Sequence, residues 1–294
     1  MTAPTTLADA RQSTPDATPT TPMVTGAPLR VGLVAASDKP NSVALRPYRP
    51  TTPLPVQAEP VEAHPEPHGA HPITLHCGTA LWLLPQRAVW WPAAKMVFVA
   101  DVHFGKAATF RRAGQPVPHG TTADNLARLD ALLATTAATH LVFLGDFLHA
   151  RSGAADALWS QLLPWRERHA TLHMTLVRGN HDVHAGEPAA GLRITTVEEP
   201  WQPVPTIGVL ACHHPQTTAT ATVLAGHLHP TVTLRGLARD TLRLPCFAHT
   251  PGLLILPAFG AFTGMASESI APSAQRFAIA EGRVLAVPTQ AGRP

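Results

Sequence analysis

Cysteine is scarce in this chain of 294 residues, and long apolar runs are missing altogether. The three cysteines, Cys77, Cys212 and Cys246, form no CxxC pair, which excludes a disulfide framework and a zinc ribbon and favours a reducing cytoplasm. No apolar run approaches the ~18 residues that a membrane helix needs. Because the N-terminus also lacks the basic start and apolar stretch of a signal peptide, we expect a protein that is neither exported nor bound to a membrane.

Glycine-rich loops that bind nucleotides are also missing. The stretch Gly260–Gly264 (GAFTG) lacks the Lys-Ser/Thr pair of a P-loop, and no dinucleotide fingerprint is present. Charged residues make up only 14% of the chain, and its formal net charge is +3. This balance is compatible with a polyanionic substrate but lies far from the charge density of a protein that coats nucleic acid.

Proline, by contrast, is abundant, and many of the 31 prolines fall in the first part of the chain. Residues 1–70 are rich in Thr, Pro and Ala without sustained periodicity, so we expect a disordered extension, in which only the apolar patch 29–36 could form a short strand. Residues 71–271 are expected to form one folded domain, and residues 272–294 a C-terminal tail.

The expected domain opens with three short strands, ITLHC, ALWLL and AVWWP, which read as a meander. Apolar runs then alternate with helical patterns. Residues 122–138 space their leucines along one helix face, and residues 154–168 predict a second helix with a kink at Pro164. Strands that alternate with helices in this way predict an α/β fold.

Polar clusters follow five of the apolar runs. They are Asp101-Val-His103, Gly145-Asp146, Gly179-Asn180-His181-Asp182, His213-His214-Pro215 and Gly226-His227-Leu-His229. In open α/β sheets, ligands bind at the carboxyl ends of the strands. Charged and imidazole groups at the ends of buried strands would be costly to desolvate unless they paired or bound metal. We therefore expect the five clusters to form one site.

The donor types in these clusters indicate the kind of metal. Carboxylates, imidazoles and one amide, without thiolates, suit divalent ions of intermediate hardness such as Mn, Fe, Zn or Co. Histidine alone is weak evidence, because the chain has seventeen. His149, His173, His184 and His249 receive no direct role, although His149 could support Asp146 from outside the metal site.

The ordered signature DxH, GD, GNH(D/E), H and GHxH, complete between Asp101 and His229, resembles that of the calcineurin-like metallophosphoesterase superfamily. The resemblance implies a four-layer α-β-β-α sandwich of two mixed sheets and a dinuclear metal centre that hydrolyses phosphate esters. It assigns Asp101, His103 and His229 to one metal, Asn180, His213 and His227 to the other, and Asp146 to both. Either His213 or His214 could be the fourth-cluster ligand; His213 is preferred because it comes first after the strand.

The same resemblance gives roles to the residues beside Asn180. His181 is placed to protonate the leaving oxygen as a general acid. Asp182 would orient His181 or its neighbours, although an acidic residue at a strand end is often only a turn or cap residue.

Several further motifs are similar to the ligase-associated DNA-damage-response subfamily, known as PdeM. They are DVHFGKAATFRRAGQPVPHGT, GDFLHARSG, VRGNHD, GHLHP, LPCF and LPAFGAFTGM. This resemblance implies a DNA nuclease or phosphodiesterase that uses Mn(II) and works with a DNA ligase or helicase repair system. Two other functions stay open: a phosphatase or pyrophosphohydrolase of a small molecule, and a non-enzymatic interaction scaffold. Retention of His181 and all seven ligands argues against the scaffold.

Four basic residues are candidate phosphate contacts. Lys106, Arg111 and Arg112 follow the first metal motif, and Arg178 directly precedes Gly179. They could reach a phosphate backbone or position the scissile group. The alternative for the first three is a solvated helix face.

Overall fold

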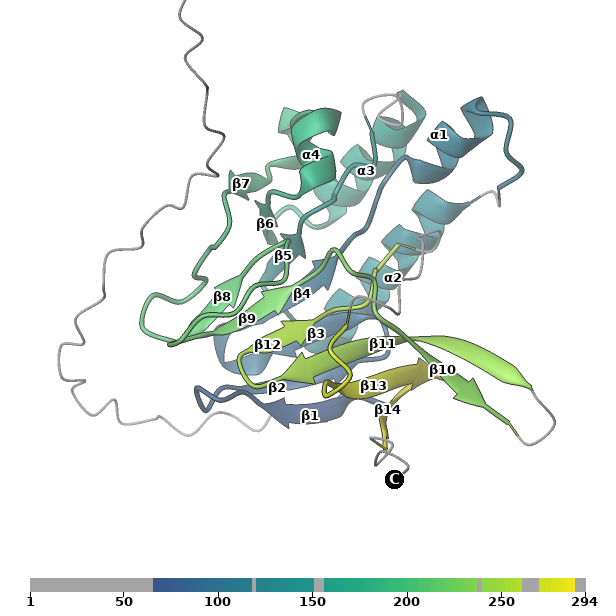
Figure 1. Ribbon diagram of the computed structural model, residues 1–294. Coiled ribbons are helices and arrows are strands. Elements are labelled where there is room, and N and C mark those ends of the chain that lie inside the picture. Colours follow the sequence, from purple (N-terminus) through teal and green to yellow (C-terminus); the bar gives the residue numbers. More distant parts are fainter. Residues whose placement is uncertain (1–65, 118–119, 151–155, 237–239, 261–269, 289–294) are drawn as a thin grey trace, which may run out of the picture. The chain divides into compact units, whose positions relative to one another are not determined.

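The structure is a computed structural model, and it describes residues 66–117, 120–150, 156–236, 240–260 and 270–288 (Figure 1). These residues belong to one unit, Ala58–Pro294. Most of the expected extension 1–70, including the patch 29–36, lies outside the described residues and stays a prediction.

The first sheet has the order β1-β2-β3-β4-β5-β6-β7. Its antiparallel half is the predicted meander, formed by β1 (His71–Thr74), β2 (Ala80–Leu84) and β3 (Ala88–Trp91), and a short 3-10 helix η1 (Pro92–Ala94) leads on from it. The parallel half consists of β4 (Met96–Ala100), β5 (His140–Leu144), β6 (His173–Val177) and β7 (Thr195–Val197). Because β4, β5 and β6 are parallel, the segments after them meet at one edge of the sheet.

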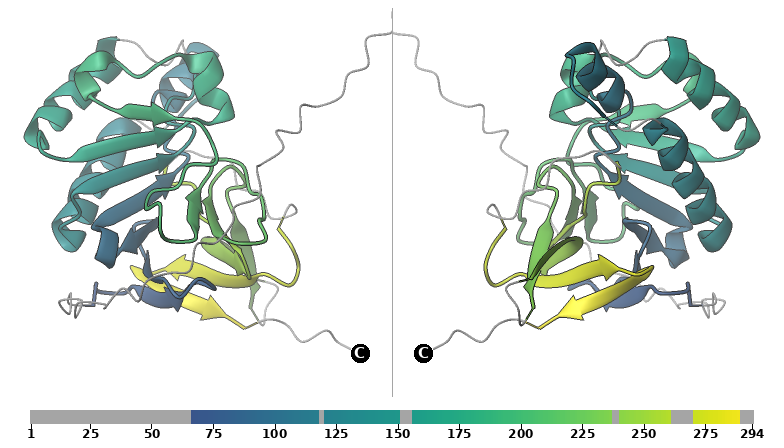
Figure 2. Two further views of the ribbon diagram at one scale, coloured as in Figure 1. Left: turned by 90° about the vertical axis from the view of Figure 1, so that its left-hand side faces the viewer. Right: turned by 90° about the vertical axis from the view of Figure 1, so that its right-hand side faces the viewer.

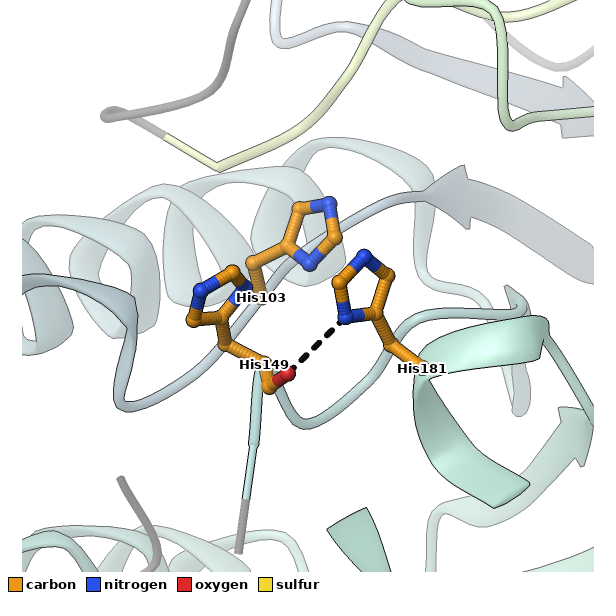
Figure 3. Close-up of side chains that lie close together, drawn as sticks. All are labelled: His103, His149 and His181. Atoms are coloured by element: carbon orange, nitrogen blue, oxygen red, sulfur yellow. Dashed lines mark hydrogen bonds between the residues drawn. The ribbon is translucent and has the colours of Figure 1, made fainter. Parts of the chain in front are cut away.

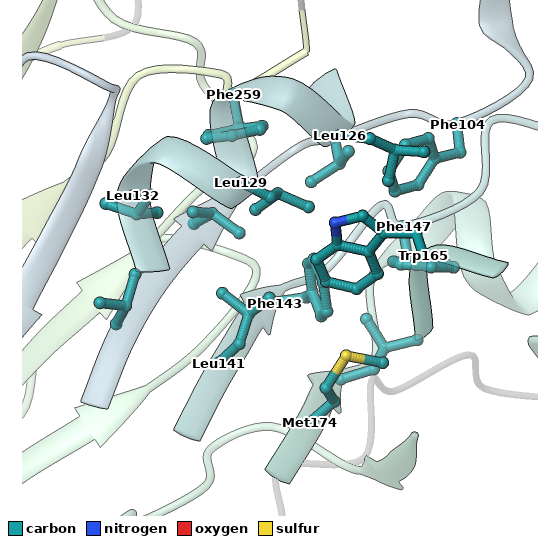
Figure 4. Close-up of a cluster of buried hydrophobic side chains, with 14 of the residues drawn as sticks. Phe104, Leu126, Leu129, Leu132, Leu141, Phe143, Phe147, Trp165, Met174 and Phe259 are labelled. Carbon is teal, nitrogen blue, oxygen red and sulfur yellow. The ribbon is translucent and has the colours of Figure 1, made fainter. Parts of the chain in front are cut away.

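Helices connect the parallel strands. They are α1 (Lys106–Arg112), α2 (Thr121–Thr136), α3 (Asp156–Arg168), α4 (Asn180–Ala185) and the 3-10 helix η3 (Ala190–Leu192). The two longer helices agree with the predicted ones to within a few residues, and α3 continues through Pro164. Leucines of α2 pack with Trp165 of α3 against Leu141 and Phe143 of β5, which joins the helices to the first sheet (Figure 4).

The second sheet has the order β14-β13-β11-β12-β9-β8, with β10 paired to β11. Its strands are β8 (Val209–Ala211), β9 (Thr222–Ala225), β10 (Thr231–Arg235), β11 (Thr241–Thr250), β12 (Leu253–Ile255), β13 (Gln275–Ala280) and β14 (Arg283–Val287). β8, β9 and β12 are parallel, and the remaining pairs are antiparallel.

The predicted tail from residue 272 is wrong, because β13 and β14 are strands of the second sheet. Phe277 of β13 pairs with Phe247 of β11, and both Phe277 and Val284 are buried. Glu281 and Gly282, which join the two strands, both have positive φ. Such a pair is typical of a tight hairpin turn, and this signal was overlooked in the sequence.

A second apolar core lies between the two sheets. Phe98, Val142 and Leu144 contribute from the first sheet, and Leu224 and Phe247 contribute from the second. Figure 2 shows the two sheets next to each other, with the helices beside the first. The predicted α/β class with two mixed sheets is confirmed. All α-helices among the described residues fall between residues 106 and 185, on the side of the first sheet, and none of the described helices is long and apolar enough to cross a membrane.

Candidate metal centre

The structure brings all seven predicted metal ligands together after the parallel strands of both sheets. They are Asp101 and His103 after β4, Asp146 after β5, Asn180 after β6, His213 after β8, and His227 and His229 after β9. Five of them have a positive φ: Asp101 (53°), His103 (49°), Asp146 (51°), His227 (69°) and His229 (47°). Such conformations cost residues other than glycine roughly 1–3 kcal/mol each and cluster at functional sites.

Glycines in the same motifs allow the ligand loops to approach one another. A Cβ atom on Gly145 would lie 2.2 Å from Nδ1 of His213, and one on Gly226 would lie 2.7 Å from Oδ2 of Asp101. A Cβ on Gly179 would lie 2.5 Å from Oδ1 of Asp146. Each predicted strand-end glycine is therefore needed because a ligand side chain occupies the space of its missing Cβ.

One group of donors gathers around Asp101, which is fully buried. Oδ1 of Asp101 lies 3.3 Å from Nε2 of His229, and Oδ2 accepts a hydrogen bond from the backbone N–H of His227 at 2.9 Å. His103 is also in reach, so Asp101, His103 and His229 can offer three atoms to one ion.

The other group gathers around His213, which is also fully buried. Its Nε2 lies 2.9 Å from Oδ1 of Asn180 and 3.0 Å from Nδ1 of His227. Its Nδ1 lies 3.0 Å from the carbonyl oxygen of Leu144, an acceptor, so Nδ1 carries the proton and Nε2 keeps its lone pair.

Asp146 lies between the two groups. Its Oδ1 is 3.5 Å from Nε2 of His213, and its Oδ2 is 3.7 Å from Nε2 of His103. Each oxygen therefore faces the imidazole of a different group, as a carboxylate that bridges two ions would.

The neighbouring His214 can also group with His213 and His227 around a cation, but Glu199 engages its ring. Its Nδ1 lies 2.6 Å from Oε1 of Glu199, and its side chain is 46% exposed. Glu199 also accepts hydrogen bonds from the backbone N–H groups of His213 and His214. The geometry favours His213 over His214, and Glu199 is a supporting residue that the sequence analysis missed.

The unsatisfied polar atoms in the centre fit a bound metal. Oδ1 of Asp101 and Nδ1 of His103 are buried and have no hydrogen-bond partner. Burial, Lys106 and the surrounding histidines lower the pKa of His103 to about 2, so its ring is neutral and able to bind a cation. Burial raises the pKa of Asp146, with Asp101 adding to the rise and His213 opposing it. Cations between these carboxylates would offset the cost of burying them together.

His181 projects towards the centre from the start of α4 and packs on His149 (Figure 3). Nδ1 of His181 donates a hydrogen bond to the carbonyl oxygen of His149 at 2.9 Å, and the two rings stack with centroids 5.1 Å apart. Nε2 of His181 lies 4.0 Å from Oδ2 of Asp146, and the side chain is 39% exposed. The ring can therefore meet both the centre and a bound substrate.

His149 is part of the site, although the sequence analysis gave it no direct role. Its ring packs edge-on against His103 at 5.4 Å, and it can group with His103 and His181 around a cation. Burial, Lys106 and His181 lower the pKa of His149 to about 4. Its place three residues after Asp146 in GDFLHA was the available sequence signal.

Asp182 acts on the neighbours of His181 rather than on its ring. Its buried carboxylate accepts hydrogen bonds from the backbone N–H groups of Phe147, Leu148 and Gly179, at 3.0, 3.3 and 2.9 Å. These bonds join the segment after β5 to the segment after β6. These contacts place Asp182 to position the neighbours of His181 rather than to react itself.

Among the basic candidates, Lys106 lies close enough to the centre to interact with it. Burial lowers the pKa of Lys106, while Asp101 and Asp146 raise it. Arg178, in contrast, is engaged elsewhere: its Nη2 lies 2.8 Å from Glu187 and its Nε 2.9 Å from Glu198. Two carboxylates bind its guanidinium group in this structure, and a phosphate contact for Arg178 stays a prediction.

Arg87 and Arg128, two arginines outside the metal motifs, support Asp101 indirectly, by binding the backbone segment that hydrogen-bonds to Ala100 and Asp101. The backbone N–H groups of Phe259 and Gly260 donate to the carbonyl oxygens of Ala100 and Asp101, at 2.7 and 3.2 Å. Arg87 donates to the carbonyl oxygens of Ala258 and Gly260, and Arg128 to that of Phe259. The PAFG part of the LPAFGAFTGM motif therefore stabilises the backbone position of Asp101.

Comparison with known proteins agrees with this geometry. The model of the calcineurin-like phosphoesterase family matches residues 94–245, which include every proposed ligand. This chain belongs to the calcineurin-like phosphoesterase family and is a metal-dependent phosphoesterase, a hydrolase.

Among solved structures, the Pseudomonas putida nuclease MPE is 44% identical, with a TM-score of 0.64, over 74% of this chain and 100% of that one. This similarity agrees with the resemblance to the PdeM subfamily. A phosphoesterase from E. coli, Yfce, is 16% identical, with a TM-score of 0.34, over 65% of this chain and 97% of its own. A search of curated proteins gave no match.

Proposed function

We propose that this protein hydrolyses phosphodiester bonds in DNA at a dinuclear metal centre. The observation that carries the proposal is the position of Asp146, whose two oxygens face His103 and His213 in separate groups of donors. The Pseudomonas putida relative, a nuclease that is 44% identical over its whole length, supports a nucleic-acid substrate.

The donors divide between two ions. Asp101, His103 and His229 would hold one ion, Asn180, His213 and His227 the other, and Asp146 both. When bound, two such ions neutralise the charge of a phosphoryl group and activate water for attack on it. Mn(II) is the proposed ion, with Fe, Zn and Co as alternatives, because oxygen and imidazole donors without thiolate suit this group of metals.

The protein's own residues complete the reaction. His181 is proposed as the general acid, with its Nδ1–H held by the carbonyl oxygen of His149 and its Nε2 on the side of Asp146. A proton on Nε2 would pass to the leaving oxygen as the bond from phosphorus to that oxygen breaks. Lys106 adds positive charge beside the centre, which favours binding of an anionic substrate.

The biological setting is part of the proposal and rests on the sequence. The PdeM-like motifs imply a role in DNA repair linked to a ligase or helicase. The cytoplasmic location likewise remains a prediction, as do the domain start near residue 71 and the disordered extension before it.

A hydrolysis assay tests the proposal. With Mn(II) added, we would compare bis-p-nitrophenyl phosphate, p-nitrophenyl phosphate, and single- and double-stranded DNA, using His181→Ala as the control for contaminating nucleases. Cleavage of the diester and of DNA, with DNA cleavage lost in His181→Ala, is the expected result. A preference for the monoester with DNA left intact would overturn the nuclease proposal in favour of a small-molecule phosphatase.

A further inference from the structure

A groove beside the metal centre has no role in the proposed reaction. Its volume is about 220 Å³, and its lining includes Ala107, Ala108, Arg111, Thr121, Thr122 and Gln161, from α1, α2 and α3. We propose that this groove binds the nucleic-acid backbone next to the scissile phosphate, with Arg111 contacting a flanking phosphate. The inference rests on the proposed nuclease function and adds a second subsite to it.

The groove adjoins the metal centre. A smaller cleft is lined by His103 and Lys106, and it shares Gly105, Thr121 and Thr122 with the groove. A chain whose scissile phosphate lies at the metal ligands can therefore continue past Gly105 into the groove.

The chemistry of the lining suits a phosphate group. Among the described residues it offers one guanidinium, two hydroxyl groups and one amide, and no carboxylate. Arginine presents a planar set of donors that fits phosphate with two parallel hydrogen bonds. Because none of the described lining residues has an aromatic ring on which a base could stack, this lining is suited to the backbone rather than to the bases.

The distance along helix α1 from Lys106 to Arg111 suits the spacing between the scissile phosphate and a flanking phosphate. Lys106 and Phe110 lie one turn apart on the side of the centre, with the Lys106 ammonium 6.0 Å from the Phe110 ring and that ring 6.0 Å from His149. Arg111 is five residues beyond Lys106, which is about 7.5 Å along a helix. This length corresponds to roughly two steps of a stacked strand, so Arg111 would contact a phosphate one or two nucleotides from the cleaved bond.

The same helix provides a matched control. Arg112, the next residue and also a candidate phosphate contact from the sequence, is exposed and is not part of the groove lining, so its position favours the alternative of a solvated helix face. Arg111→Gln and Arg112→Gln remove the same charge from adjacent positions. If Arg111 binds a flanking phosphate, only Arg111→Gln should weaken that contact. A general electrostatic attraction between α1 and DNA would be weakened by both substitutions.

The experiment measures kcat/KM with Mn(II) for a DNA oligonucleotide and for bis-p-nitrophenyl phosphate, which has no flanking phosphate. We expect Arg111→Gln to lower the value for the oligonucleotide about ten-fold and to change that for the small diester less than two-fold, with Arg112→Gln close to wild type on both. For Arg111→Gln, the plot of log kcat/KM against log salt should become shallower by about 0.7–0.9. Ala108→Trp, which fills the groove without a change of charge, should reproduce the selective loss.

Equal losses in Arg111→Gln and Arg112→Gln, or no loss in either, would overturn the inference. A parallel loss of small-diester hydrolysis in Arg111→Gln would also overturn it, because the defect would then lie at the centre. Failure of the wild-type protein to cleave both substrates would instead refute the proposed function itself, and it would be seen before any variant is compared.

Discussion

Nδ1 of His181 donates a hydrogen bond to the carbonyl oxygen of His149 at 2.9 Å, and the two imidazole rings stack at 5.1 Å. The hydrogen bond fixes the orientation of the His181 ring and leaves its Nε2 for the substrate. His181 also contacts the centre through its backbone N–H, which donates to Oδ1 of Asp146 and does not depend on the ring.

His181→Ala should therefore slow hydrolysis while the metals stay bound. A general acid contributes roughly 10²–10⁴-fold, so we expect a loss of that size for substrates with a poor leaving group such as DNA. The loss should be smaller for p-nitrophenyl esters, whose leaving group needs little protonation. Steady-state rates and the metal content of the same samples check this, and an equal loss on both substrates would argue against proton donation by His181.

Gly145→Ala should disrupt the metal centre, and Gly78→Ala provides its control. Both glycines have positive φ, 74° and 82°, but a Cβ at Gly145 would overlap the His213 ring, whereas one at Gly78 would meet nothing within 4 Å. The backbone strain alone should cost about 1–2 kcal/mol in both variants. We expect Gly145→Ala to lose metal affinity as well, as measured by calorimetric titration with Mn(II); unchanged affinity would contradict the assigned position of His213.

Arg178→Gln should leave the hydrolysis of DNA almost unchanged. Its guanidinium binds Glu187 and Glu198, two exposed carboxylates, and such surface pairs contribute about 0–1 kcal/mol to stability. Thermal unfolding and kcat/KM for an oligonucleotide are the measurements. A large rise in KM with normal stability would instead support the phosphate contact predicted from the sequence.

The metal-free protein should lose stability in acid partly through His149. Its pKa is about 4 in the folded state and near 6.5 when unfolded, so between these values the unfolded chain binds more protons. The contribution of His149 to the free energy of unfolding is thus fully present above about pH 6.5, and it is lost as the pH falls towards 4. The free-energy difference between wild type and His149→Gln, from urea unfolding at pH 7 and pH 5, should shrink in acid; a constant difference would contradict a buried neutral ring.

The sheet edge that carries the candidate metal ligands was predictable, because the ends of strands and the types of ligand residues are both visible in the local sequence. Asp101, Asp146 and Asn180 directly follow apolar runs, and parallel strands bring such ends together whatever the loops between them do. The meander and the two longer helices, α2 and α3, were predictable for the same reason, since each depends on a local period.

Features that depend on contacts distant in sequence were not predictable. Arg87 reaches carbonyl oxygens more than 170 residues away, and no local pattern indicates that contact. Arg178 looked like a phosphate ligand until the fold placed Glu187 and Glu198 beside it. β13 and β14 were missed for a different reason: the turn signal of Glu281 and Gly282 between them was overlooked.

The most direct test of a dinuclear centre bridged by Asp146 is to measure bound Mn(II) per chain and bis-p-nitrophenyl phosphate hydrolysis on the same samples of wild type and Asp146→Asn. We predict two ions per wild-type chain, and weakened metal binding with loss of turnover in a variant that is still folded by circular dichroism. Full turnover in folded Asp146→Asn, or a wild-type enzyme that hydrolyses the diester with no metal bound, would contradict the account.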